Sequence, residues 1–163
     1  MVTRSGHGRA LITALVAIVI AVSAAQASAQ SLISFSGGAS IDPTQVYTGV
    51  AWESPDIAGR FRIRPGIDGG FGDGLRLGTI HLDLLVKFPL GGSGWALMQG
   101  GGPVISIAKY TGDLEDFPRE VHAGGSYFLG FAHDSGFFTE MRLGGGNWVP
   151  QLKLGVGWTI EIR

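Results

Sequence analysis

The sequence predicts an all-β fold, a closed antiparallel up-and-down β-barrel of about eight strands that follows a cleaved N-terminal signal peptide. Three observations support this prediction. Apolar and polar residues alternate in short segments, as in strands, whose side chains point to opposite faces in turn. Turn-forming residues separate these segments at hairpin spacing. After residue 29, no apolar run reaches the ~20 residues that a membrane-spanning helix needs.

The first 29 residues have the features of a secretory signal. Arg4 and Arg9 give a positive start, residues 10–25 form an apolar run, and Ala27-Ser28-Ala29 is a small-x-small cleavage site. A cleaved signal fits this segment better than a membrane anchor, because the run is short and small polar residues follow it. We therefore expect a signal peptide at 1–29 and one β-barrel domain at 30–163.

Composition narrows the possible functions. The signal segment carries two of the 12 Lys and Arg residues and none of the 13 Asp and Glu residues, so the mature net charge is 10 − 13 = −3. This charge gives no reason to expect a nucleic-acid partner. The chain has no cysteine, which excludes disulfides and Cys-ligated metal sites. Because no helix follows either glycine run, neither is a phosphate-binding loop, and we expect no cofactor.

The first four strands are expected at residues 32–41, 45–53, 59–68 and 79–88. The first alternates serines with Ile and Phe, and the second alternates Val, Thr and Trp with smaller or polar residues. Pro65 in the third strand cannot donate to a ladder, which predicts a bulge or an irregular strand end. Residues 69–74 are expected to form a glycine-rich loop. Leu75 and Leu77 have the opposite parity to the apolar residues that follow, which predicts a bulge near Gly78.

The last four strands are expected at residues 95–109, 121–132, 137–144 and 152–163. Alternation in the fifth is weak around residues 100–103, so its register stays open. The longest and most acidic loop is expected at Tyr110 to Glu120, and His133 to Gly136 form a tight hairpin turn. The final strand has the clearest pattern. Its apolar residues, from Leu152 to Ile162, share one face, and its charged residues and glycines share the other.

Alternation does not show which face is inside, but size favours one of the two arrangements. An eight-stranded barrel has an interior just wide enough for side chains to fill, and the rows of Phe, Trp and aliphatic residues would overfill it. We therefore expect the apolar rows to face lipid, with opposite charges paired in a narrow lumen. The predicted lumen network consists of Arg60, Arg62, Arg64, His81, Asp83, Glu140, Arg142, Lys153 and Glu161.

Aromatic residues are expected in two groups, one at each rim, as in the interfacial girdles of membrane barrels. Up-and-down topology places Trp52, Phe88, Trp95 and Trp158 near the end where the chain termini lie. It places Tyr47, Tyr110 and Trp148 near the other end.

Several segments together resemble the small bacterial outer-membrane β-barrel proteins of the opacity type, the class of eight-stranded outer-membrane barrel domains. They are Asp83-Leu84-Leu85-Val86-Lys87-Phe88-Pro89, then Trp95 with Gly100-Gly101-Gly102, then Phe138 to Gly144, and the final Leu-x-Leu-x-Val-x-Trp-x-Ile strand. The resemblance covers essentially all of 30–163. It implies a location in the cell outer membrane of a Gram-negative envelope, with outer-membrane lipid and the barrel assembly machinery as partners.

Three sets of residues invite a chemical interpretation. His133 and Ser135 with Glu140 suggest a hydrolase, but the Glu spacing does not fit a lipid A deacylase pattern, and an ordinary turn explains the first two. His81 and Asp83 share a face, yet two ligands without a third make a weak metal site. The acidic residues of the longest loop lack the spacing of a calcium loop. We therefore expect no catalytic, cofactor or metal residues, and no enzyme.

The expected function is that of an outer-membrane barrel with a structural, surface-interaction or narrow-pore (porin-like) role. Its interior would be filled by a polar and charged network. The sequence gives no extracellular partner. The first alternative is a soluble, lipocalin-like periplasmic barrel that binds a hydrophobic ligand. A weaker alternative is a lipid-modifying outer-membrane enzyme.

Overall fold

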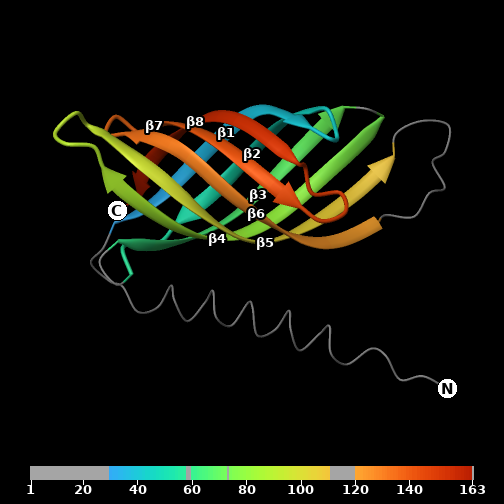
Figure 1. Ribbon diagram of the computed structural model, residues 1–163, viewed down its shortest axis with the longest axis horizontal. Coiled ribbons are helices and arrows are strands. Elements are labelled where there is room, and N and C mark those ends of the chain that lie inside the picture. The colour runs from blue at the N-terminus through green and yellow to red at the C-terminus, as the bar shows by residue number, and fades with distance from the viewer. Residues whose placement is uncertain (1–29, 58–59, 73, 111–119, 163) are drawn as a thin grey trace, which may run out of the picture.

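Antiparallel strands close into a single barrel, in which each strand is hydrogen-bonded to the next along the chain and the first pairs with the last (Figure 1). The strands are β1 (Ser31–Ile41), β2 (Gln45–Glu53), β3 (Phe61–Gly72), β4 (Leu75–Pro89), β5 (Trp95–Tyr110), β6 (Glu120–His133), β7 (Phe137–Gly145) and β8 (Leu152–Ile162). The up-and-down barrel predicted from the alternation is therefore confirmed.

The computed structural model describes residues 30–57, 60–72, 74–110 and 120–162. The predicted signal peptide and most of the predicted acidic loop lie outside these residues. Both the start of β1 and the end of β8 lie at one end of the barrel, which we call the terminal end, and we call the opposite end the loop end. Among the described residues, no helix is long and apolar enough to cross a membrane.

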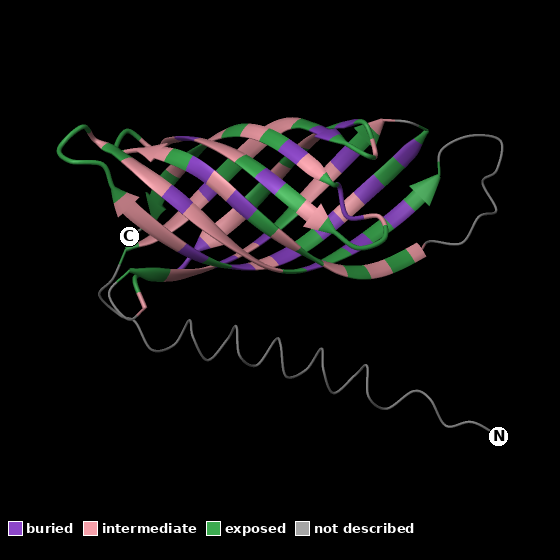
Figure 2. Ribbon diagram, in the orientation of Figure 1, coloured by how far each residue is buried: buried purple, intermediate pink, exposed green. Residues whose placement is uncertain are grey.

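The two faces of the sheet differ as the alternation predicts (Figure 2). Buried and exposed residues alternate along the strands: Leu154 is 51% exposed on the outer face, whereas Arg64 and Asp83 are 3% and 1% exposed on the inner face. The outer face carries large apolar side chains on every strand. A soluble barrel would have the opposite arrangement, with charges outside and apolar residues inside.

Both irregularities predicted around β4 are wrong. β3 and β4 keep one register from Gly72↔Leu75 to Phe61↔Val86, so no bulge occurs at Gly78, and residues 69–72 belong to β3 rather than to a loop. The change of parity has another cause: Leu75 and Leu77 point into the barrel. Gly70 lies within the strand and faces the lumen, where a Cβ would meet the Gln45 side chain. Gln45 donates from Nε2 to the Leu75 carbonyl at 3.0 Å.

Neither proline shifts the register of its strand. Pro65 sits in unbroken register with Leu82 of β4, so the first predicted possibility, a bulge, is absent. The pairing of β3 with β2 ends at Gly66, beside Pro65, in line with the second possibility, an irregular end. Pro103 pairs with Gly125 of β6, while the β4–β5 ladder is interrupted opposite it and then resumes in the same register. Each residue of an antiparallel strand directs its backbone groups to only one neighbouring strand, so a proline interrupts the ladder on one side alone. The pairings also fix the register of β5, which the sequence left open.

The charged lumen as candidate functional site

A cluster of six charged side chains occupies the middle of the lumen. Three are cationic and three are carboxylates, and β3, β4, β7 and β8 supply them: Arg64, Arg142, Lys153, Asp68, Asp83 and Glu140. Their formal charges cancel. This balance matters because removing ions from water is costly, and only well-placed partners offset that cost.

Arg142 is the most extensively bonded member. Its two terminal nitrogens donate to both oxygens of Asp83, at 3.0 and 2.8 Å, and Nε donates to Glu140 at 3.0 Å. A further bond of 2.8 Å reaches the hydroxyl of Ser126 on β6. Such a bidentate contact between a guanidinium and a carboxylate is geometrically specific as well as strong. Arg142 therefore ties β7 to β4 and β6.

The other cations extend the cluster around the lumen. Arg64 donates to Glu140 at 2.7 Å and to Asp83 at 3.3 Å, and Lys153 donates to Asp68 at 2.6 Å. His81 lies between two carboxylates: Nδ1 is 3.0 Å from Asp83 and Nε2 is 3.8 Å from Asp68.

Three of the ion pairs cross the barrel rather than follow its wall. Arg64 on β3 reaches Glu140 on β7, and these strands lie opposite each other in the closed order. Arg142 on β7 reaches Asp83 on β4, and Lys153 on β8 reaches Asp68 on β3, each spanning three strand positions. Side chains that meet from facing walls fill the space between them. A cavity of about 30 Å³ remains beside the cluster, which is room for a few water molecules at most.

Four buried apolar side chains, which we call the wedge, support the charged cluster from the side of the terminal end. Phe128 is fully buried with Leu85, Met98 and Phe138, and its ring lies under two guanidinium groups. The Arg64 and Arg142 Cζ atoms are 4.0 and 4.9 Å from the ring centroid, within cation–π range. Gly100 makes room for this ring, because a Cβ there would come within 3 Å of it. This packing accounts for the glycine at position 100, within the part of β5 where the alternation is weak.

A second, smaller group of charges lies nearer the terminal end. Glu53 accepts from Lys87 at 2.7 Å and lies 3.7 Å from Arg62, which also bonds Asp56 at 2.6 Å. Glu53 is buried although it is ionisable, and Ser34 donates to it at 3.4 Å.

The structure brings most of the predicted network residues together and leaves two outside. Arg60 is exposed and precedes β3, whose first residue is Phe61, so the alternation was extended one residue too far. Glu161 is exposed near the end of β8. Sequence reasoning did not assign Glu53, Asp68 and Lys87 to the network. Their inward parity within strands was the available signal.

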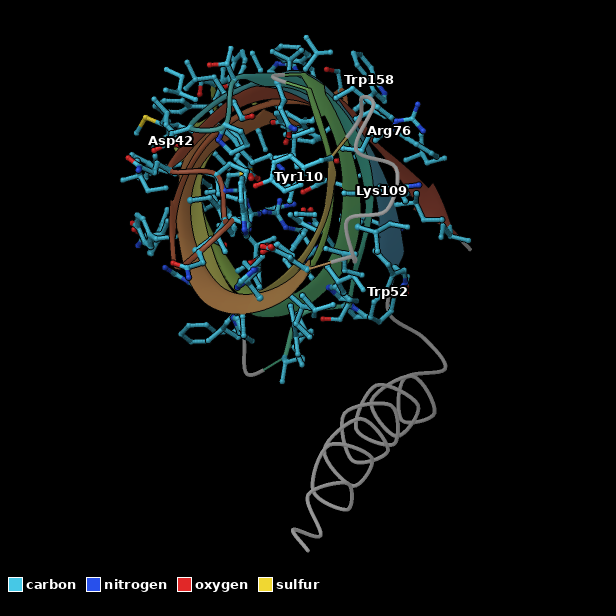
Figure 3. The ribbon with its side chains drawn as sticks, turned by 90° about the vertical axis from the view of Figure 1, so that its right-hand side faces the viewer. Asp42, Trp52, Arg76, Lys109, Tyr110 and Trp158 are labelled. Atoms are coloured by element: carbon cyan, nitrogen blue, oxygen red, sulfur yellow. The ribbon has the colours of Figure 1, made fainter. Side chains whose placement is uncertain are left out.

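The predicted aromatic rim at the loop end is wrong. Tyr47 has inward parity and lies in the lumen, where the Lys153 Nζ is 4.0 Å from its ring centroid. Trp148 packs on Leu75, Leu77 and Ala108 and donates from Nε1 to Glu120 at 2.9 Å. Tyr110 has inward parity too, meets Trp148 edge to face with centroids 5.7 Å apart, and lies across the barrel mouth (Figure 3). These aromatics cover the interior instead of facing outward.

The aromatics of the terminal end do face outward. Trp158, Phe137 and Trp95 form a row of edge-to-face contacts, with centroids 6.3 and 6.4 Å apart, and Trp95 also meets His133 at 4.9 Å. Trp52 and Phe88 have the same outward parity near that end.

The residues considered for hydrolysis do not assemble. The His133 Nδ1 lies 2.9 Å from the Ser135 hydroxyl within an exposed turn. Glu140 is inside the barrel, where Arg64 and Arg142 occupy its carboxylate. It therefore does not orient the imidazole, as the third member of a triad would.

Comparison with known proteins adds evidence on the fold. No protein-family model matches the chain, and no curated protein matches it by sequence. The crystal structure of the N-terminal beta-barrel domain of Pseudomonas aeruginosa OprF is similar, with a TM-score of 0.56 at 15% identity over 83% of this chain and 100% of that one. The crystal structure of Neisserial surface protein A (NspA) gives a TM-score of 0.59 at 11% identity, over 82% of this chain and 95% of that one.

The fold is that of the small outer-membrane β-barrel proteins. The resemblance predicted from the sequence segments is thereby confirmed at the level of architecture. At these identities the likeness concerns the barrel and not the residues inside it.

Proposed function

We propose that this protein is inserted in the outer membrane as a closed barrel, with a structural or surface-interaction role rather than that of an open pore. The observation that carries the proposal is the combination of an apolar outer face with ion pairs that cross the lumen. A transmembrane barrel places apolar side chains against lipid and polar ones inside.

The crossing ion pairs argue for a closed lumen. Arg64–Glu140 and Arg142–Asp83 occupy the centre of the barrel, and Phe128 fills the space beneath them. Trp148 and Tyr110 add a cover at the loop end. The role is therefore expected to reside in the surface that the barrel presents and not in the passage of solutes.

The two alternatives have less support. A soluble barrel that carries a hydrophobic ligand needs an apolar cavity, whereas the cavity beside Arg64 and Arg142 is small and charged. A lipid-modifying enzyme needs a nucleophile with an oriented base, and the exposed pair His133 and Ser135 lacks the third group. We propose that the protein is not an enzyme, and Ser135→Ala should leave any lipid-modifying activity of the purified chain unchanged.

Cell fractionation with gel mobility tests membrane insertion. The protein should sediment with the outer membrane, require detergent for extraction, and migrate differently in boiled and unboiled samples. Detergent-independent protein confined to the periplasm would contradict the proposal. In proteoliposomes, the same material should give no faster sugar-induced swelling than protein-free vesicles, and rapid swelling would contradict the closed lumen.

A further inference from the structure

Two cations in the described strands differ from all the others there. Five strand cations point into the lumen and each has a carboxylate partner: Arg62, Arg64, Lys87, Arg142 and Lys153. The remaining two, Arg76 on β4 and Lys109 on β5, are exposed on the outer face. Neither has an ion pair with any carboxylate of the described residues.

These two cations are direct neighbours. Arg76 and Lys109 are cross-strand partners in the β4–β5 ladder, and both project outward from the same side of the barrel (Figure 3). Like charges placed directly opposite each other on a sheet destabilise it. An anion between the two side chains would remove that repulsion. A guanidinium beside an ammonium suits a phosphate, which the first can bind through two bonds and the second as a point charge.

Their position is at the edge of the apolar outer face. Towards the terminal end, the next outward residues on these two strands are Gly78 and Ile107, followed by Ile80 and Ile105. Ile80 is 49% exposed and Ile105 is 42% exposed, so the wall below the cations is apolar. Basic side chains just beyond an apolar band lie at the depth of lipid head groups and attract anionic lipids.

The wall directly beneath the cations carries two residues without side chains. Gly69 and Gly78 are cross-strand partners with outward parity. A Cβ at Gly78 would meet nothing closer than the Ile107 carbonyl at 3.9 Å, and one at Gly69 nothing closer than the Phe71 ring at 4.0 Å. The packing of the protein therefore does not require glycine at either position. Because neither has a side chain, space is left on the outer wall between Phe71 and Ile107, and we call this place the recess.

We propose that Arg76 and Lys109 bind the phosphate head group of an anionic membrane lipid in the leaflet at the loop end. The glycerol or acyl portion of the lipid lies over the recess at Gly69 and Gly78. This inference rests on the proposed insertion of the barrel in a membrane, and it adds a specific lipid contact on the outer wall.

Native mass spectrometry of the full chain tests the proposal. The folded protein is equilibrated in micelles that contain equal amounts of phosphatidylglycerol and phosphatidylcholine, and the ratio of retained lipids is measured. The wild type should favour phosphatidylglycerol. Arg76→Gln and Lys109→Gln should each lower that ratio about fivefold, the effect expected for losing one cation near a lipid surface. Arg60→Gln, at an exposed cation outside the strands, should leave the ratio unchanged.

A second variant tests the recess separately from the charges. Gly78→Leu keeps both cations but fills the recess, and it should also lower retention of phosphatidylglycerol. The shift in gel mobility on boiling checks that every variant is folded, and the exposed position of these residues predicts that it will be.

The contrary results are distinct. Equal retention of both lipids by the wild type, or unchanged retention in Arg76→Gln and Lys109→Gln, would overturn the proposal. Removal of the preference by millimolar inorganic phosphate would also overturn it, because the site would then bind a free anion and not a lipid. A protein that never enters membranes would refute the proposed function itself, whereas an inserted barrel without lipid preference would refute only this inference.

Discussion

Replacing Arg142 by Met tests the lumen network most severely. The substitution keeps a long, unbranched side chain but removes one of the three cations in the central cluster. Asp83, whose side chain is fully buried, loses two bonds of 2.8 and 3.0 Å, and Glu140 loses one of 3.0 Å. Among the described residues, Arg64 and His81 are the cationic or imidazole groups that then remain within reach of the Asp83 carboxylate.

The expected cost follows from that uncompensated charge. Removing one partner of a buried ion pair costs about 3–5 kcal/mol, because the other partner stays desolvated without compensation. The upper part of this range is appropriate here, because Arg142 contacts two carboxylates as well as the Ser126 hydroxyl. The charge-balanced double variant, Arg142→Met with Asp83→Asn, should lose less stability than the sum of the two single variants, with a coupling of about 0.5–3 kcal/mol.

The measurement is reversible urea unfolding of the barrel from lipid vesicles, followed by tryptophan fluorescence. The urea concentration at the midpoint, multiplied by the slope of free energy against urea concentration, gives the free energy of unfolding in water. Met141→Leu is the matched control. Met141 is the residue before Arg142, and its side chain faces outward. Leu has a similar volume, so the substitution should cost less than about 1.5 kcal/mol of unfolding free energy. If Arg142→Met costs no more than this control, the crossing ion pairs do not stabilise the barrel and the reasoning fails.

Two further predictions concern packing inside the barrel. Gly157→Val should prevent barrel closure, because a Cβ at this position would meet the Phe35 backbone and the Phe138 ring. The folded, heat-modifiable gel band should therefore be lost. It should persist in Gly145→Ala, because nothing lies within 4 Å of a Cβ at that position. Phe128→Ala should lower the free energy of unfolding by about 3–5 kcal/mol, the usual cost of deleting a buried phenyl ring, and a value below 1 kcal/mol in the same urea assay would contradict the role given to the wedge.

Much of the fold could be predicted from the sequence because the alternation along each strand agrees with the spacing of the turns. The alternation in β8 and β2 located both strands closely, and the narrowness of an eight-stranded barrel decided which face is inside. The charged cluster followed from the same parity argument. Arg64, Asp83 and Arg142 share inward positions, and the lumen is too narrow to keep them apart.

The errors have separate physical origins. The interior was expected to be polar throughout, so the inward leucines of β4 were attributed to a bulge, although Leu75 and Leu77 pack under Trp148. Likewise, the aromatics of the loop end were assigned by their distance along the chain. Tyr47 has the same parity as Gln45 and Glu53, and this pattern placed it inside the barrel. Contacts between distant strands, such as that of Phe128 beneath Arg64, are not visible in local periodicity.

The most direct test of the central claim is the environment of the outer face. The chain has no cysteine, so single cysteines at Ile80, Ile105 and Val156 can each carry a spin label without background. In reconstituted vesicles, all three labels should collide often with oxygen, which concentrates in lipid, and rarely with a water-soluble nickel complex. High nickel accessibility at all three positions would show that this apolar face is in water and would contradict the account of a membrane-inserted barrel.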